Sequence, residues 1–119
     1  MIPVDASVWI DHLLRSDPRM SSLLAEREVL QHPFVTGELA CDHLCGRRDE
    51  LLPALAVLPR APVIPQRRVL RLLEEEHLFG IGLSWIDVHL LASTQASRTR
   101  LWTRDRELER AASRLGIAA

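Results

Sequence analysis

The clearest structural pattern in this chain lies in Gly80-Ile81-Gly82-Leu83-Ser84-Trp85-Ile86-Asp87-Val88-His89-Leu90-Leu91-Ala92-Ser93. Ser84 stands where a helix N-cap is expected, and the apolar residues after it recur at helical spacing, so one face of the helix is buried. Asp87 falls in the first turn of this mostly apolar helix. Because a charge near the core is costly unless something pairs with it, Asp87 requires a helix terminus, a cation or a metal ion.

The composition is that of a soluble globular protein. The chain has 119 residues, 47% hydrophobic and 26% charged, and we expect a single domain over 1–119. No apolar run approaches the roughly 20 residues that span a membrane. The start Met1–Asp5 lacks the basic and long apolar stretch of a secretory signal. The sequence therefore predicts a cytoplasmic protein with no membrane partner.

The chain has two cysteines, Cys41 and Cys45. They lie four apart on a predicted helix. Thiols in an unexported chain are typically free, and a metal site built on them would need two more soft ligands. We expect both to be buried, unbridged core residues.

Arginine supplies all 15 basic residues, against 16 acidic ones, and the net charge is −1. Biased genomic composition explains this choice, although the planar arginine fork also suits phosphate. The C-terminal segment is locally basic, with six arginines between 98 and 119.

Short strands alternate with helices along the chain. The expected strands are 2–4, 28–31, 63–64, 100–103 and 117–118, and the expected helices are 6–15, 18–27, 34–45, 48–58, 66–78, 84–97 and 105–115. This alternation predicts an α/β fold with a mostly parallel sheet covered on both faces.

Four carboxylates are predicted to share one edge of that sheet. Asp5 and Asp105 stand at strand ends that also begin helices, and Glu38 and Asp87 lie in first turns of helices. Ligands of an open parallel sheet bind at the carboxyl ends of its strands. Each acid alone also fits a helix cap, and Ser84-x-x-Asp87 has the form of a capping box.

Four close carboxylates repel one another, and several would protonate unless a cation offset them. Ligand sets made only of oxygen suit Mg²⁺ or Mn²⁺. Two such ions about 4 Å apart can activate a water and stabilise the leaving oxygen in phosphodiester hydrolysis.

Four motifs, in this order, resemble those of the PIN-domain ribonucleases, most closely the VapC toxins of bacterial toxin–antitoxin pairs. They are Val4-Asp5-Ala6-Ser7-Val8-Trp9-Ile10-Asp11, Thr36-Gly37-Glu38-Leu39-Ala40, Trp85-Ile86-Asp87-Val88-His89-Leu90-Leu91-Ala92 and Leu101-Trp102-Thr103-Arg104-Asp105. The resemblance implies a three-layer α/β/α sandwich and an endoribonuclease that depends on Mg²⁺, with Mn²⁺ able to substitute. It also implies a homodimer that can enter a larger toxin–antitoxin complex. A cognate antitoxin would neutralise it by filling a groove over the active site.

The resemblance assigns roles to individual residues. Asp5, Glu38 and Asp87 would be the acidic triad that holds the metal, with Asp105 as a fourth and more variable acid. It matches Ser7 and Thr103 to small hydroxyl positions, and their expected task is to orient carboxylates or waters. We expect a metal-bound water to attack the RNA phosphodiester and leave 5′-phosphate and 3′-hydroxyl ends.

Other polar and aromatic residues have weaker assignments. Arg104 and Arg106, which flank Asp105, are candidates for RNA phosphate contacts. The three tryptophans could stack on bases, but their apolar surroundings favour the core. No spacing among the five histidines indicates a metal site, and we expect them at the surface or core edge.

Two alternatives stay open. The chain could be a catalytically silent PIN-fold module that binds RNA or the antitoxin without cleavage. A Mg²⁺-dependent phosphatase also places aspartates at strand ends, but it needs a second aspartate two residues after the nucleophile, where this chain has Ser7.

Overall fold

Two short parallel strands lie at the centre of the molecule. The computed structural model describes all residues 1–119, and in it β1 (Ile2–Pro3) pairs with β2 (Val29–Leu30). Single parallel bridges extend this pair, joining Val4 to Trp102, Gln31 to Arg60 and Leu101 to Ala118. The order across the sheet is therefore residue 60, β2, β1, residues 101–102 and residue 118. This arrangement confirms an α/β fold with a short parallel sheet.

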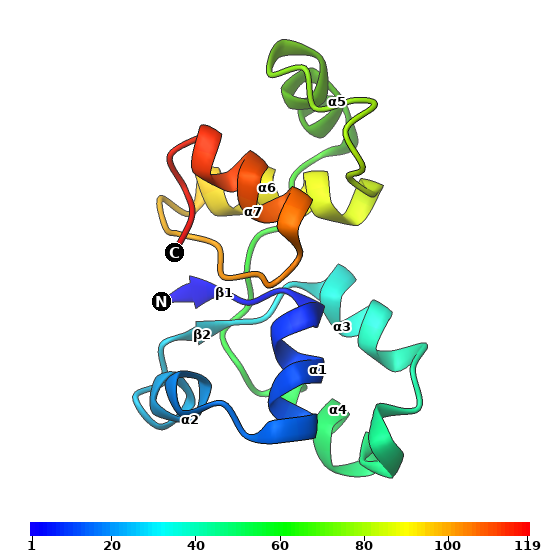
Figure 1. The fold of residues 1–119 in the computed structure, drawn as a ribbon, viewed down its shortest axis with the longest axis vertical. Helices are drawn as coiled ribbons and strands as arrows, with labels where there is room; N and C mark the ends of the chain where they lie inside the picture. The colour runs from blue at the N-terminus through cyan, green and yellow to red at the C-terminus, as the bar shows by residue number, and fades with distance from the viewer.

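The helices lie on both sides of the strands (Figure 1). They are α1 (Ala6–Arg15), α2 (Pro18–Ala25), α3 (Pro33–Ala40), the 3₁₀ turn η1 (Leu44–Gly46), α4 (Arg48–Ala56), α5 (Gln66–Glu75), α6 (Trp85–Ala96) and α7 (Arg106–Arg114). In Figure 1, α1 to α4 occupy one side and α5 to α7 the other. None of them is both long and apolar enough to cross a membrane.

Helix α6 begins where the sequence predicts it. The Ser84 side chain accepts the Asp87 N–H and the Asp87 side chain accepts the Ser84 N–H, which completes a capping box. Every residue from Val88 to Thr94 is buried, including fully enclosed Leu90 and Leu91. A helix buried all round in this way belongs to the centre of the core.

The predicted helix 34–45 is wrong at its C-terminal end. Helix α3 stops at Ala40, and Leu44 and Cys45 adopt positive φ angles of 54° and 53°. The Arg48 guanidinium donates to the carbonyls of Ala40 and Asp42, which the helix no longer satisfies. Cys41 and Cys45 therefore share no helix and are exposed free thiols, so their predicted burial is also wrong.

The predicted strand at 63–64 is absent, since this part of the chain pairs with β2 only at Arg60. Pro62 and Pro65 flank the segment and have no N–H to donate to a sheet. The predicted strand 100–103 is reduced to two bridging residues, Leu101 and Trp102.

Two predictions about aromatic residues also need correction. Trp9 and Trp102 are buried as expected, but Trp85 is 39% exposed because it occupies the first position of α6, at the surface. His32 and His89 are fully buried rather than at the surface or core edge. They pack with Phe34, whose ring centroid lies 5.1 Å from that of His32 and 4.6 Å from that of His89.

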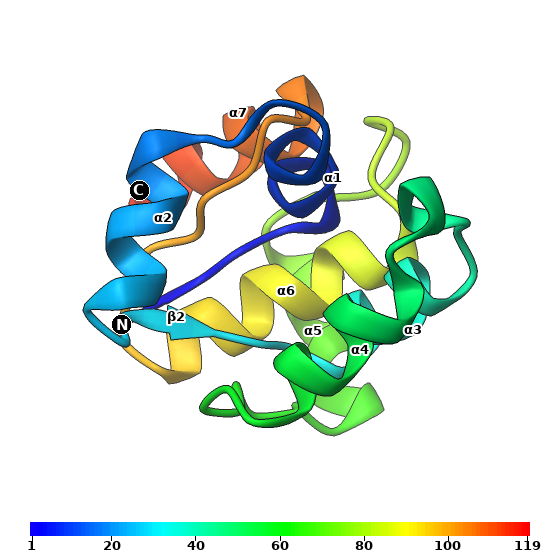
Figure 2. The same cartoon turned by 90° about the horizontal axis from the view of Figure 1, so that it is seen from below.

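The parallel strands place their carboxyl ends together. Seen from below in Figure 2, β1 and β2 run from near α2 toward the opposite side, where α1 and α3 begin. The segment that precedes α7 runs the same way, and Val4 bridges to Trp102 within it. The residues that follow these segments therefore lie near one edge of the sheet.

Candidate active site

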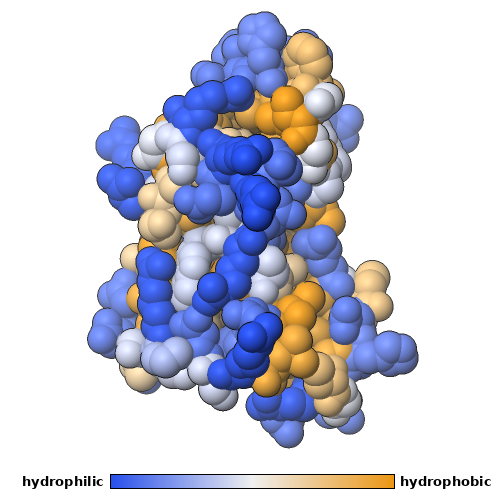
Figure 3. All heavy atoms as spheres, viewed as in Figure 1, coloured by the Kyte–Doolittle hydropathy of each residue, from blue (hydrophilic) through white to orange (hydrophobic).

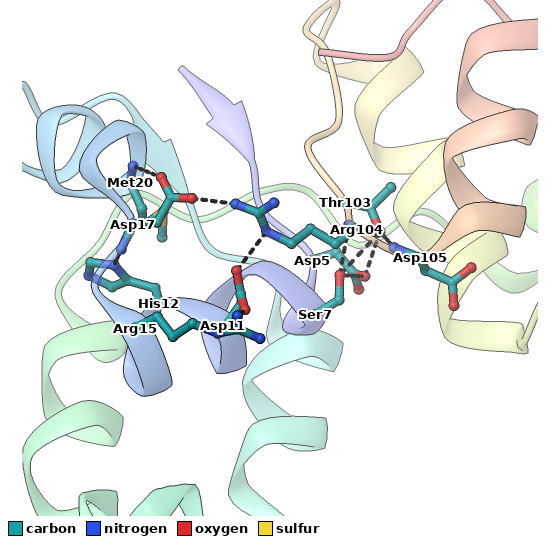
Figure 4. Close-up of polar contacts among 10 residues, drawn as sticks. All are labelled: Asp5, Ser7, Asp11, His12, Arg15, Asp17, Met20, Thr103, Arg104 and Asp105. Carbon is teal, nitrogen blue, oxygen red and sulfur yellow. Dashed lines mark hydrogen bonds and ion pairs between the residues drawn. The ribbon is translucent and has the colours of Figure 1, made fainter.

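Asp5 follows β1 and is 6% exposed. Although it occupies the N-cap position of α1, its side chain makes no capping hydrogen bond. Instead, its Oδ2 accepts hydrogen bonds from the Ser7 hydroxyl at 2.7 Å and the Thr103 hydroxyl at 2.8 Å (Figure 4). The helix-cap alternative is therefore wrong for Asp5, and its Oδ1 has no protein hydrogen-bond donor.

The two hydroxyls are themselves held by the loop before α7. The Ser7 oxygen accepts the Arg104 N–H at 3.0 Å, and the Thr103 oxygen accepts the Asp105 N–H at 3.0 Å. The two hydroxyl oxygens are 3.3 Å apart. Ser7 and Thr103 thus lie beside Asp5 and fix one of its oxygens.

The carboxylates of Asp87 and Asp105 each accept a hydrogen bond from a backbone N–H at the start of their own helix. Oδ2 of Asp87 accepts the Ser84 N–H at 2.9 Å, and Asp105 accepts the Leu108 N–H at 3.0 Å as the N-cap of α7. Both carboxylates still reach solvent. Both acids therefore cap their helices, as the alternative interpretation of the sequence predicted. Each keeps its second carboxylate oxygen free of backbone hydrogen bonds.

Glu38 is different because it caps nothing. Helix α3 starts at Pro33, so Glu38 lies in its second turn and not in the predicted first turn. His32 is the N-cap, and its Nδ1 accepts the Phe34 N–H at 3.0 Å. The Glu38 side chain is exposed and has no hydrogen-bond or ion-pair partner in the protein.

The acids influence one another electrostatically. Although Glu38 as a whole residue is exposed, partial desolvation of its carboxylate and then the charges of Asp5 and Asp87 raise its pKa. Burial raises the pKa of Asp87, the charges of Asp5 and Asp105 add to this rise, and the hydrogen bonds from Ser84 oppose it. The structure therefore gathers the four predicted acids in one negative region.

This region is not a ready-made metal cage, because no three of these side chains lie close enough together to enclose an ion as they stand. The donor set nevertheless fits a hard divalent cation. All the donors are carboxylate oxygens, and Asp5 and Glu38 keep oxygens with no protein donor. A cation there would also relieve the repulsion that raises the pKa values of Glu38 and Asp87.

The two arginines beside Asp105 have different surroundings. The Arg104 guanidinium pairs with Asp11 through Nε, at 3.1 Å, and with Asp17 through Nη2. Arg106 is exposed and forms no ion pair. On the face shown in Figure 3, hydrophilic residues form a band over the part of the molecule where Figure 1 places α7.

An apolar groove adjoins the acidic region and was not foreseen from the sequence. It has a volume of about 450 Å³, and its lining includes Phe34, Gly37, Glu38, Trp85 and Ile86. Glu38 thus borders both the groove and the acids. The one signal in the sequence was that Trp85 is the first residue of α6, where a helix is often left uncovered.

Comparisons with known proteins agree with this geometry. No family model matches the chain. Ribonuclease VapC32 of Mycobacterium tuberculosis, from strains CDC 1551 / Oshkosh and ATCC 25618 / H37Rv, is 43% identical over 119 residues, which cover 99% of this chain and 95% of that protein. The crystal structure of PAE2754 from Pyrobaculum aerophilum shares the fold, with a TM-score of 0.72 at 18% identity over 99% of this chain and 87% of the other. This chain therefore belongs to the VapC family of ribonucleases, as the motifs around Asp5, Glu38 and Asp87 predicted.

Proposed function

We propose that this protein is a divalent-metal-dependent endoribonuclease, the toxin of a toxin–antitoxin pair, and that Asp5, Glu38, Asp87 and Asp105 form its catalytic centre. The observation that carries the proposal is that these four acids influence one another's charge while none of them forms an ion pair. The pKa values of Glu38 and Asp87 are raised partly by neighbouring acids. Arg104, which precedes Asp105 in the chain, directs its guanidinium toward Asp11 and Asp17 instead (Figure 4).

Mg²⁺, or Mn²⁺ in its place, would be held by Asp5, Glu38 and Asp87, with Asp105 as a further ligand. Such an ion would supply an activated water and charge neutralisation for phosphodiester hydrolysis. Ser7 and Thr103 fix Oδ2 of Asp5 and leave Oδ1 for the ion. The capping box restrains Asp87 in the same way.

The substrate is RNA, and Arg106 is the better placed of the two predicted phosphate contacts. It begins α7 next to Asp105, is exposed, and has no acidic partner. Arg104 stays a prediction as a phosphate contact, although its guanidinium already has two carboxylate partners.

Family membership supports the wider architecture that we propose. We propose one PIN-like domain over 1–119, a three-layer α/β/α sandwich, supported by helices on both sides of a parallel sheet. A cognate antitoxin, a homodimer that can enter a larger toxin–antitoxin complex, and a cytoplasmic location complete the proposal. No membrane partner is part of it.

The test is Asp5→Asn, because asparagine keeps the shape and an oxygen acceptor for Ser7 and Thr103 while it removes the charge. We expect the folded variant to lose RNA cleavage in Mg²⁺, and Asp49→Asn, an exposed change on α4, to keep it. EDTA should stop the wild type. Cleavage by folded Asp5→Asn, or cleavage in EDTA, would overturn the proposal. Wild-type protein that binds RNA but never cuts it at any Mg²⁺ or Mn²⁺ concentration would favour the silent-module alternative.

A further inference from the structure

The side chain of Arg104 connects the loop before α7 with the junction of α1 and α2 (Figure 4). Nε of Arg104 lies 3.1 Å from Oδ2 of Asp11, on α1, and Nη2 pairs with Oδ2 of Asp17, the N-cap of α2. In Figure 4 the guanidinium points away from Asp105. Two separate elements thus hold the end of this side chain.

The main chain of the same residue contacts the catalytic centre. The Arg104 N–H donates to the Ser7 oxygen at 3.0 Å, and the Ser7 hydroxyl donates to Asp5 at 2.7 Å. On either side of Arg104, the Asp105 N–H donates a hydrogen bond to the Thr103 hydroxyl oxygen, and the Thr103 hydroxyl donates one to Asp5. Arg104 therefore spans the distance from the Asp5 network to the α1–α2 junction.

The principal partner of Arg104 is itself fixed. Asp17 accepts the Met20 N–H at 3.1 Å through Oδ1, and its own N–H donates to Nδ1 of His12 at 2.8 Å. The Asp17 side chain is only 16% exposed. The Met20 hydrogen bond and, to a lesser degree, Arg104 lower the pKa of Asp17, so it stays ionised at neutral pH. A guanidinium fork that bridges two carboxylates is held more firmly than a single surface ion pair.

We propose that Arg104 is a positioning residue: by anchoring residues 103–105 to Asp11 and Asp17, it keeps the Ser7 and Thr103 hydroxyls on Asp5. This inference rests on the proposed function only for the role of Asp5 in holding an ion. It differs from the phosphate contact expected from the sequence, in which the Arg104 guanidinium would face the RNA. Partners behind a metal ligand typically change metal affinity 10–100-fold when they are removed.

The first measurement needs no metal. In Arg104→Gln, amide hydrogen exchange should become faster at residues 104 and 105, whose N–H groups donate to Ser7 and Thr103. Arg15→Gln is the matched control, because Arg15 also pairs with Asp11 but contacts neither Ser7 nor Asp17. Unchanged exchange at both amides of folded Arg104→Gln would overturn the inference.

The second measurement is Mn²⁺ affinity, which a purely structural anchor would not change. We expect Arg104→Gln to raise the Mn²⁺ Kd about tenfold and Arg15→Gln to leave it unchanged. Asp17→Asn should weaken Mn²⁺ binding in the same direction, since asparagine keeps the α2 cap but loses the charge that holds Arg104. An unchanged Kd in folded Arg104→Gln would contradict the inference, whereas wild-type protein that binds no Mn²⁺ would contradict the proposed function and leave the exchange test to decide.

The third measurement separates positioning from phosphate contact. Binding of a fluorescein-labelled, mixed-sequence 20-nucleotide RNA is followed in EDTA at increasing salt. Loss of one phosphate contact lowers the slope of log K against log salt by about 0.7 for a single strand. We expect the slope of Arg104→Gln to equal that of the wild type, and a slope reduced by that amount would show that Arg104 contacts RNA and overturn the inference.

Discussion

His32 should make the fold sensitive to mild acid. It is 1% exposed, and burial, followed by the charges of His89 and Arg60, lowers its pKa to about 4 from an ordinary 6.5. Its Nδ1 accepts the Phe34 N–H, so the proton of the neutral ring lies on Nε2, which has no partner. Protonation would put a hydrogen on Nδ1, pointing at the Phe34 N–H, and would remove the cap of α3.

The size of the effect follows from linkage. Between the folded pKa and the unfolded value, the unfolded chain binds a proton at residue 32 that the folded chain does not. Stability therefore falls as the pH falls through this window. From pH 7.5 to pH 5 the loss is about 2 kcal/mol, a large fraction of the total for a domain of this size.

The assay is urea unfolding of the wild type and His32→Asn at both pH values. Asparagine can still cap α3 but does not titrate. Other groups also titrate. The lowered pKa of His89 adds to the loss of stability on acidification, whereas the raised pKa values of Glu38 and Asp87 oppose it. They are common to both proteins, so the difference isolates His32. If the wild type and His32→Asn lose equal stability between pH 7.5 and pH 5, the reasoning about His32 is refuted.

Three further outcomes are expected. Ser84→Ala removes the acceptor for the Asp87 N–H and should lower the free energy of unfolding by about 1 kcal/mol in a denaturant titration; no change would mean that the capping box is not formed. Because the pKa values of Glu38 and Asp87 are raised, Mn²⁺ affinity should start to fall on acidification at a higher pH than carboxylates of ordinary pKa would allow, with proton release on binding that calorimetry in two buffers would detect. An affinity that falls only in the ordinary carboxylate range would contradict the shared negative region. Leu91→Ala, at a fully buried site, should cost about 2–5 kcal/mol, whereas Val57→Ala, at a residue that is 82% exposed, should change stability by less than about 0.5 kcal/mol; equal effects would contradict the packing around α6.

Elements determined by local sequence could be predicted. The Ser84-x-x-Asp87 box starts α6, and Asp105 caps α7, because each cap involves only residues within three positions. The grouping of Asp5 with Asp105 also followed, since parallel strands end at one edge of the sheet. Glu38 was also predicted among these acids, from an expected first-turn position, although α3 starts at Pro33 and places Glu38 in the second turn.

Features that depend on distant residues could not be predicted. The break after Ala40 relies on Arg48, eight residues later, to satisfy the freed carbonyls. Arg104 meets Asp17 across 87 positions of sequence, so its local surroundings indicate a free cation next to an acid. The exposure of Trp85 similarly depends on what covers the start of α6 and not on helical periodicity.

The central claim is that Asp5, Glu38 and Asp87 together hold one divalent ion. Anomalous diffraction from a crystal grown with Mn²⁺ tests it most directly. We expect a peak with carboxylate oxygens of all three residues at a bonding distance of about 2.1 Å, and no peak at the same place in Asp5→Asn. A well-ordered wild-type crystal with no Mn²⁺ near these carboxylates, and with the three side chains still apart, would contradict it.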